Sequence, residues 1–199
     1  RPRDPNTDLV TRIVTAEIDG EKIPYETQLN LCFTINLAGL DTTKSGLSYI
    51  LYYLANNPDV RARLVANPDL WPKAIEELIR LHCLIIEGGR IVTADTDFHG
   101  LPMKKDDVVW LGFAAASRDP RKFENPTVFD IDRPNLNQHL SFGAGVHRCI
   151  GMHLARAEMN IALRTWHEQI PHYTVASATE IIERGGQLSL KSLPLAWSV

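Results

Sequence analysis

The sequence predicts a mainly helical fold with a small β region. After Pro24 no proline occurs up to Asn56, and apolar residues recur there mostly at three- or four-residue steps, which predicts one long helix over residues 24–56. A second apolar stripe with helical spacing predicts another long helix over residues 150–170. Short runs of β-type residues within residues 90–111 predict a small hairpin-like sheet.

The remaining elements complete what is expected to be part of one domain over residues 1–199. The first 23 residues carry a short amphipathic stretch and a turn, so they are expected to be a helix end and a linker. Pro58 and Pro68 each suit the first turn of a helix, which predicts helices over residues 59–65 and 70–82. A long loop, a glycine-rich loop and a tail of irregular strands follow at residues 117–141, 142–151 and 172–199. The stripe of the second long helix comprises Ala155, Met159, Ala162, Trp166 and Ile170.

The composition excludes several classes of protein. With 44% hydrophobic and 23% charged residues, the chain resembles globular proteins rather than disordered or membrane-spanning ones. A net charge of -3 lacks the basic excess that binding to a phosphate backbone requires, so no nucleic-acid partner is expected. The longest apolar window, residues 29–40, contains Asn30, Thr34 and Asn36, so no membrane partner is expected either. Three widely spaced cysteines indicate a reducing, cytoplasmic compartment.

The strongest chemical signal is the glycine-rich segment of residues 142–151. Gly143 and Gly145 permit positive φ and allow the backbone to approach a flat ligand closely. Cys149 is expected at the start of a helix, where N–H groups and the helix dipole favour a thiolate that can ligate iron. His147 could reach a carboxylate at the rim of a planar cofactor. The alternatives are a small buried cysteine and an ordinary surface histidine.

This segment resembles the haem-binding signature of the cytochrome P450 family, F-x-x-G-x-x-x-C-x-G. The fixed positions are filled by Phe142, Gly145, Cys149 and Gly151. The resemblance implies haem b as the cofactor, Cys149 as its axial ligand, and Phe142 as a shield between the sulfur and water. It covers essentially all 199 residues and corresponds to the C-terminal half of a family member. Residue 1 is arginine rather than methionine, so the start of the chain is expected to be processed or truncated, and the resemblance implies that the N-terminal half is absent.

A second motif lies midway along the first long helix. Gly39 and the run of poor helix formers after Leu40 cost stability in a helix interior, and a functional site explains that cost. The segment Ala38-Gly39-Leu40-Asp41-Thr42-Thr43 resembles the oxygen-activating motif of the family. The resemblance implies that Ala38 and Gly39 contact the haem. It also implies that the Thr42 hydroxyl donates a hydrogen bond to dioxygen, while Asp41 connects to solvent and delivers protons. The alternative is a helix bend in which the threonine hydroxyl bonds back to a carbonyl.

Three further charged residues match family landmarks that hold the structure together. Glu77 and Arg80 are similar to the E-x-x-R pair, and Arg133 lies in the long loop where a third member of this network is expected. The alternative is an ordinary surface ion pair between residues three positions apart. Arg90 resembles the family's arginine that pairs with a haem propionate, and the resemblance implies the same role for His147. The alternative for Arg90 is an ordinary exposed arginine on a strand. The apolar run of residues 84–86 lines the substrate pocket or packs in the core.

The activity implied by the resemblance is haem-thiolate monooxygenation, in which one oxygen atom of O₂ enters a small apolar organic substrate. Electrons are expected from a ferredoxin-type or other electron-transfer protein that docks on a basic face. Candidates for this face are Arg61, Arg63, Lys73 and Arg148. The chain resembles the soluble bacterial branch of the family. Residues 87–107 and the tail segment Leu193-Pro194-Leu195 are faintly similar to terpenoid-oxidising members, which gives a terpenoid as the candidate substrate. Two alternatives remain open: a peroxide-dependent haem-thiolate peroxygenase and a non-catalytic haem-binding sensor.

Overall fold

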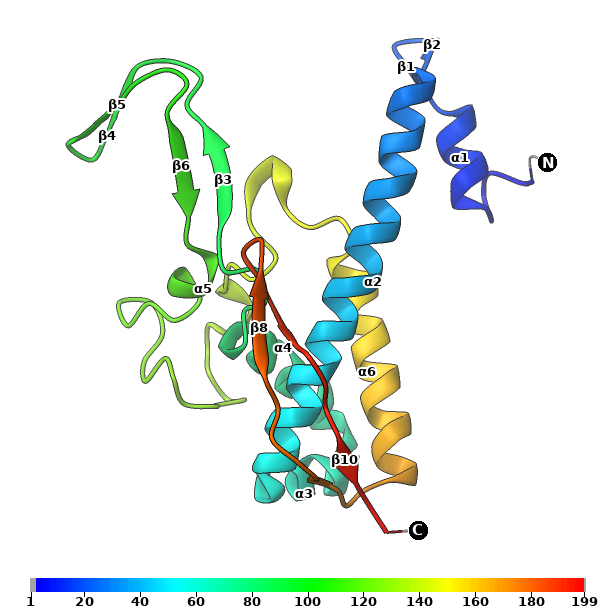
Figure 1. Cartoon of the computed structure of the whole chain (residues 1–199), viewed down its shortest axis with the longest axis vertical. Coiled ribbons are helices and arrows are strands. Elements are labelled where there is room, and N and C mark those ends of the chain that lie inside the picture. Colours follow the sequence, from blue (N-terminus) through cyan, green and yellow to red (C-terminus); the bar gives the residue numbers. More distant parts are fainter. Residues whose placement is uncertain (1–2, 199) are drawn as a thin grey trace. The chain divides into compact units, whose positions relative to one another are not determined.

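The computed structural model describes residues 3–198, which form two units on either side of the Thr42–Thr43 peptide bond. Helices dominate both units and the strands are short (Figure 1). The predicted mainly helical fold with a small β region is therefore confirmed. In the part of the chain that the structure describes, none of the helices combines the length and the apolar composition needed to span a bilayer.

The first unit contains α1 (Leu9–Thr15), a short hairpin and the beginning of α2 (Tyr25–Asn56). The Asp8 carboxylate caps α1, because it accepts a hydrogen bond from the Thr11 N–H at 3.1 Å. β1 (Glu17–Ile18) and β2 (Glu21–Lys22) pair around a turn. The sequence predicted only a linker here, since strands of two residues are too short to show alternation.

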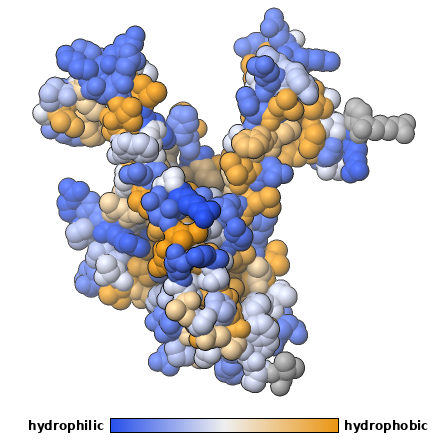
Figure 2. Space-filling model, in the orientation of Figure 1, coloured by the Kyte–Doolittle hydropathy of each residue, from blue (hydrophilic) through white to orange (hydrophobic). Residues whose placement is uncertain are grey.

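The beginning of α2 leaves its apolar side chains largely uncovered. Figure 2 shows a hydrophobic surface over this part of the helix. The exposed apolar residues are Tyr25, Leu29, Leu31, Phe33, Ile35, Leu37 and Leu40. A helix that is apolar on several faces is normally surrounded by other structure, and the described residues of this unit do not supply it.

The second unit holds the remaining helices. Pro58 occupies the first turn of its helix, as expected. Pro68 instead begins a 3₁₀ turn that leads into the next helix. In chain order these elements are α3 (Pro58–Ala66), η1 (Pro68–Leu70), α4 (Trp71–Leu81), α5 (Phe113–Ala116), η2 (Leu136–Gln138), η3 (Gly145–His147) and α6 (Met152–Gln169).

The strands of both units form five antiparallel sheets of two strands each among the described residues. In the expected β region, β3 (Gly88–Ile91) pairs with β6 (Val108–Leu111), and β4 (Thr96–Phe98) pairs with β5 (Leu101–Met103). The tail contributes β7 (Thr174–Val175), β8 (Ile181–Arg184), β9 (Gln187–Leu190) and β10 (Leu195–Ala196), paired β7 with β10 and β8 with β9.

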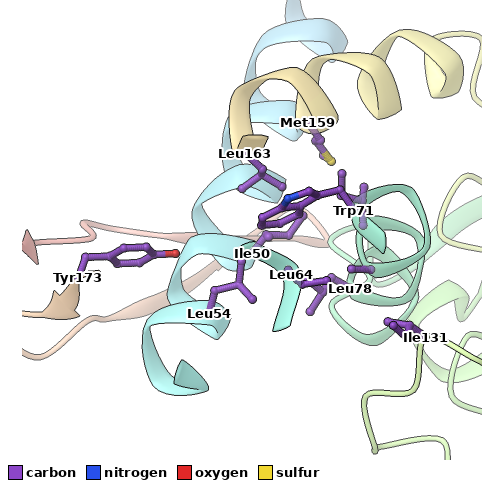
Figure 3. Close-up of a cluster of buried hydrophobic side chains, with 11 residues drawn as sticks. Ile50, Leu54, Leu64, Trp71, Leu78, Ile131, Met159, Leu163 and Tyr173 are labelled. Carbon is purple, nitrogen blue, oxygen red and sulfur yellow. The ribbon is translucent and has the colours of Figure 1, made fainter. Parts of the chain in front are cut away.

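The hydrophobic core of the second unit lies between α3, α4, α6 and the end of α2. Ile50, Leu64, Leu78 and Leu163 are at most 2% exposed. Figure 3 shows the Trp71 ring among these side chains. Helix α4 contributes most to this core because it presents a strongly apolar stripe to α6.

The buried stripe of α6 differs from the expected one. Met159, Leu163 and His167 are buried at four-residue steps, whereas Ala162 is exposed. His167 is buried because its ring nitrogens are bonded: Nδ1 lies 2.7 Å from the Leu163 carbonyl and Nε2 lies 3.0 Å from the Tyr173 hydroxyl. A pattern based on hydropathy excludes such a histidine from the core, so the predicted stripe was partly wrong.

Arg61 does not belong to the basic surface that was expected to bind an electron-transfer partner. Arg61 is buried, and its guanidinium donates to the carbonyls of Leu54 at 3.3 Å and Tyr173 at 2.6 Å. It also lies 4.5 Å from the centre of the Tyr173 ring. The prediction that Arg61 contributes to a surface is therefore wrong, because this arginine joins α3 to the end of α2 and to the tail.

Candidate functional site

The Cys loop, residues 142–151, turns back on itself before α6. Gly143 and Gly145 have φ of 66° and 68°, a region that residues with a Cβ rarely adopt. The Gly143 N–H donates to the Leu140 carbonyl at 2.8 Å, and the Cys149 N–H donates to the Phe142 carbonyl at 2.9 Å. These turns bring the two ends of the loop together and fix the backbone of Cys149.

Cys149 presents its thiol to the outside of the unit. Cys83 is buried, Cys32 is partly buried and Cys149 is exposed. Val146 and Ile150, on either side of it, are 97% and 95% exposed. Aliphatic side chains this open, next to an open thiol and two left-handed glycines, fit a flat apolar ligand that covers the loop and takes sulfur as a ligand.

The end of the Cys loop differs from the prediction that Cys149 lies at the start of a helix. α6 begins at Met152 with Gly151 as its N-cap, so Cys149 precedes the helix instead of occupying its first turn. His147 ends the 3₁₀ turn η3 and is exposed. Phe142 is partly buried, with the Arg156 guanidinium 4.5 Å from the centre of its ring. The glycine-rich loop rather than the first turn of α6 therefore positions the cysteine.

Glu77 and Arg80 form a completely buried ion pair on α4. Both side chains are 0% exposed, and Arg80 donates from Nε and a terminal nitrogen to the two carboxylate oxygens at 2.7 Å each. Arg80 also donates to the carbonyls of Ser117 at 2.9 Å and Pro126 at 2.8 Å. This burial excludes the alternative of a surface ion pair.

Arg133 joins this pair from the long loop. Its Nε donates to Glu77 Oε1 at 3.3 Å, and a terminal nitrogen donates to the Val128 carbonyl at 3.1 Å. The Asp130 N–H donates to the same glutamate oxygen at 3.1 Å. Residues 117–141 therefore need no regular secondary structure to stay in place, because their backbone is bonded to two arginines and one carboxylate.

Arg90 is exposed on β3 and donates to the Gly89 carbonyl at 2.8 Å. An exposed position on a strand is compatible both with pairing to a haem propionate and with the alternative of an ordinary exposed strand arginine. The apolar run before it is held by backbone bonds: the Leu84 carbonyl accepts from Leu188 N–H at 2.8 Å, and the Ile86 N–H donates to the Gly186 carbonyl at 2.7 Å. Residues 84–86 are partly buried.

The second motif begins at Ala38 on α2, and the first unit ends within it, at Thr42. The Thr42 hydroxyl donates to the Ala38 carbonyl at 2.7 Å. This bond is the one expected for the alternative of a helix bend, and the donation of this hydroxyl to dioxygen stays a prediction. Its oxygen can still accept a hydrogen bond from outside the helix. A Cβ at Gly39 would meet no atom within 4 Å, so space alone does not require glycine there.

The sequence analysis missed a second, partly buried cluster, formed by Glu76, His139 and Arg156. Glu76 Oε1 lies 2.9 Å from His139 Nε2 and 2.6 Å from a terminal nitrogen of Arg156. These partners are 63 and 80 positions from the glutamate, so no local spacing could reveal them. The available signals were His139 just before the Cys loop and a second acidic residue beside Glu77.

Comparison with known proteins agrees with the motifs. The family model described as cytochrome P450 matches residues 2–169. The probable cytochrome P450 127A1 of Sinorhizobium fredii is 34% identical over 199 residues, covering 100% of this chain and 48% of that protein. The putative cytochrome P450 YjiB of Bacillus subtilis is 37% identical over 177 residues, covering 89% of this chain and 44% of that protein.

Solved structures agree as well. CYP108D1 from Novosphingobium aromaticivorans matches with a TM-score of 0.90 and 34% identity, covering 96% of this chain and 46% of its own. The chain thus spans about half the length of the relatives it matches. Because the match extends over nearly all of its residues, this chain belongs to the cytochrome P450 family.

Proposed function

We propose that residues 1–199 are the C-terminal part of a haem-thiolate monooxygenase whose axial ligand is Cys149. The observation that carries this proposal is the exposed thiol between two open aliphatic side chains, in a loop shaped by Gly143 and Gly145. Members of the cytochrome P450 family bind haem b, which supplies the redox chemistry by which O₂ is activated. The protein supplies the ligand, the orientation and the protons.

Several residues of the Cys loop, together with Arg90, each have their own role in binding the cofactor. The Cys149 thiolate would ligate the haem iron, while its backbone N–H stays bonded to the Phe142 carbonyl. The Phe142 ring excludes water from the sulfur side of the loop. His147 and Arg90, both exposed, hold the two propionates.

The motif on α2 supplies protons. While the Thr42 hydrogen is bonded to the Ala38 carbonyl, the threonine oxygen can accept a hydrogen bond from the water that would deliver the proton, which would hold that water in place. Asp41 brings protons from solvent to that water. The family resemblance assigns Ala38 and Gly39 to the contact with the haem, and their small size would let a flat group approach the helix closely.

The uncovered apolar side chains of the first part of α2 support the view that further protein packs there. We assign this role to the portion of the protein that this chain does not include, together with most of the contacts to a small apolar substrate, for which a terpenoid is the first candidate. A ferredoxin-type or other electron-transfer protein docks on the basic residues that remain exposed, among them Arg63, Lys73 and Arg148. The enzyme acts in the cytoplasm.

The test is the CO difference spectrum of the reduced full-length protein that contains this chain. We expect the strongly red-shifted band of thiolate ligation, and we expect Cys149→Ala to abolish it. Cys83→Ala and Cys32→Ala are the controls, because burial raises the pKa of the Cys83 thiol and Cys32 is also partly covered, and both should keep the band. A Cys149→Ala protein that keeps the band contradicts the assignment.

Turnover separates the monooxygenase from its alternatives. A monooxygenase needs NAD(P)H-linked electron donors and O₂, and its substrates perturb the haem spectrum. Turnover with peroxide alone would favour the peroxygenase. A haem spectrum that no organic ligand alters would favour the sensor.

A further inference from the structure

The cluster around Glu76 connects α4, α6 and the segment that enters the Cys loop. Arg156 donates from Nε to Glu76 Oε2 at 2.7 Å and from a terminal nitrogen to Oε1 at 2.6 Å, so the two side chains meet in a two-bond fork. His139 lies on the other side of the carboxylate, with Nε2 2.9 Å from Oε1. The Glu76 side chain is 12% exposed and that of His139 is 1% exposed, so solvent screens this cluster weakly.

The hydrogen-bond partners assign one tautomer to His139. The Ser141 N–H donates to Nδ1 at 3.2 Å, which requires an unprotonated Nδ1. The hydrogen therefore lies on Nε2 and is donated to Glu76. Burial raises the pKa of Glu76, but the hydrogen bonds from Arg156 and His139 outweigh it and lower that pKa to about 2, so the carboxylate is ionised at neutral pH.

Two residues, Arg156 and Phe142, connect the Glu76 carboxylate to Cys149. The guanidinium that Glu76 holds lies 4.5 Å from the centre of the Phe142 ring, and the Phe142 carbonyl accepts the Cys149 N–H at 2.9 Å. The Ser141 hydroxyl also donates to the Ile79 carbonyl of α4 at 2.9 Å. The entrance of the loop is thus fixed to α4 and α6 through side chains, while its far end is exposed.

We propose that Glu76 is a positioning residue for the Cys149 thiolate, acting through Arg156 on Phe142 and through His139 on the backbone that enters the loop. The proposal rests on the proposed function, since it concerns how the ligand is held. Glu77, the next residue, has a different role: it binds Arg80 of its own helix and Arg133 and the Asp130 N–H of the long loop, and it stabilises the fold as a whole. Substituting each of the two adjacent glutamates in turn therefore distinguishes an effect on the position of Cys149 from an effect on the stability of the whole fold.

The experiment follows two signals in the full-length protein during urea titration. The red-shifted CO band reports thiolate ligation, and the fluorescence of the core residue Trp71, among the other tryptophans, reports unfolding. In the unmodified protein the two transitions should coincide. In Glu76→Gln, which keeps the shape but loses the charge, the band should be lost at lower urea than the fluorescence changes. Below the unfolding transition, about tenfold more protein should be in the form without thiolate ligation.

Glu77→Gln is the matched control, because it should shift both transitions together. Arg156→Met should behave as Glu76→Gln does, and the double variant should be no worse than either single one, since both remove the same contact. If Glu76→Gln does not accumulate as folded protein, Arg156→Lys carries the same test, because it keeps the charge but cannot make the two-bond fork.

The outcomes are distinguishable. Transitions that shift together in Glu76→Gln or Arg156→Lys overturn this proposal, since Glu76 then only stabilises the fold. Absence of the red-shifted band in the unmodified protein overturns the proposed function instead. Loss of the band ahead of unfolding, with the control variant shifting both signals, supports both.

Discussion

α4 and the Cys loop use polar groups in opposite ways. α4 buries charges, and its Glu77 and Arg80 side chains are 0% exposed and bonded to each other twice. The Cys loop leaves its only thiol open, between side chains that are 95% and 97% exposed. A buried charge that loses its partner destabilises the fold, whereas an exposed group contributes little to folding. Changes in α4 should therefore alter stability, and changes at the exposed candidate residues should alter function.

The largest effect is expected from Glu77→Gln. Because this substitution leaves Arg80 and Arg133 as buried cations without a carboxylate, it should lower the free energy of unfolding by about 3–5 kcal/mol. Urea denaturation of the full-length protein measures this. Lys104→Met is the control, since its ion pair with Asp95 is exposed and should change stability by at most about 0.5 kcal/mol. Equal effects from the two variants would remove the contrast between buried and exposed charges.

A smaller effect should appear with pH at the end of α4. Burial, with Arg118 and Arg80 nearby, lowers the pKa of His82 from 6.5 to about 4, and the rings of Tyr49 and Tyr53 lie 5.8 and 5.4 Å away. Between these pH values the unfolded chain binds a proton that the folded one does not. The neutral His82 therefore adds on the order of 3 kcal/mol to the free energy of unfolding above pH 6.5, and this stabilisation is lost as the pH falls to about 4.

Urea denaturation between pH 7 and pH 4 tests this dependence. His82→Gln should flatten the stability profile in this window, because the residue no longer titrates. His153→Gln, an exposed position on α6, should leave the slope as it is. A slope that survives in His82→Gln would assign the pH dependence to other groups.

The smallest change in stability, with a large change in chemistry, is expected at Thr42. Thr42→Ala removes one hydrogen bond to the Ala38 carbonyl within a helix, so the free energy of unfolding should fall by no more than about 1 kcal/mol. Consumption of NAD(P)H should continue while product formed per NAD(P)H falls, with the missing electrons recovered as hydrogen peroxide. Thr43→Ala is the neighbouring control and should stay coupled. A fully coupled Thr42→Ala protein would leave only the helix-bend role.

Much of the fold follows from local patterns in the sequence. The long helix ending at Asn56 and the helix starting at Pro58 follow from proline placement and apolar spacing. Burial of polar residues does not follow from such patterns. Arg61 is in the core because the Tyr173 carbonyl, 112 positions away, accepts its hydrogen bond, and His167 is in the core because the Leu163 carbonyl and the Tyr173 hydroxyl bond its ring once the chain after α6 has turned back.

The candidate site shows the same division. The positive φ of Gly143 and Gly145 and the open position of Cys149 agree with a motif contained in ten consecutive residues, 142–151. Glu76 could not be found in this way, because its partners come from a loop and from another helix. The donor role of Thr42 was also beyond the sequence, since the choice between donating outward and donating to its own helix depends on the rotamer.

The two-stranded sheets have a consequence for handling the protein. The described strands pair two by two, so most of them present a row of backbone N–H and C=O groups on their other side, whereas the other side of β9 is bonded to residues 84–86. Such rows are templates on which a further strand, from the same or another molecule, can add. The longest of these rows, on β3, β6 and β8, have four residues each. Self-association of this chain in isolation is therefore governed by backbone edges as well as by apolar side chains, and short strands limit how strongly any one edge recruits a copy.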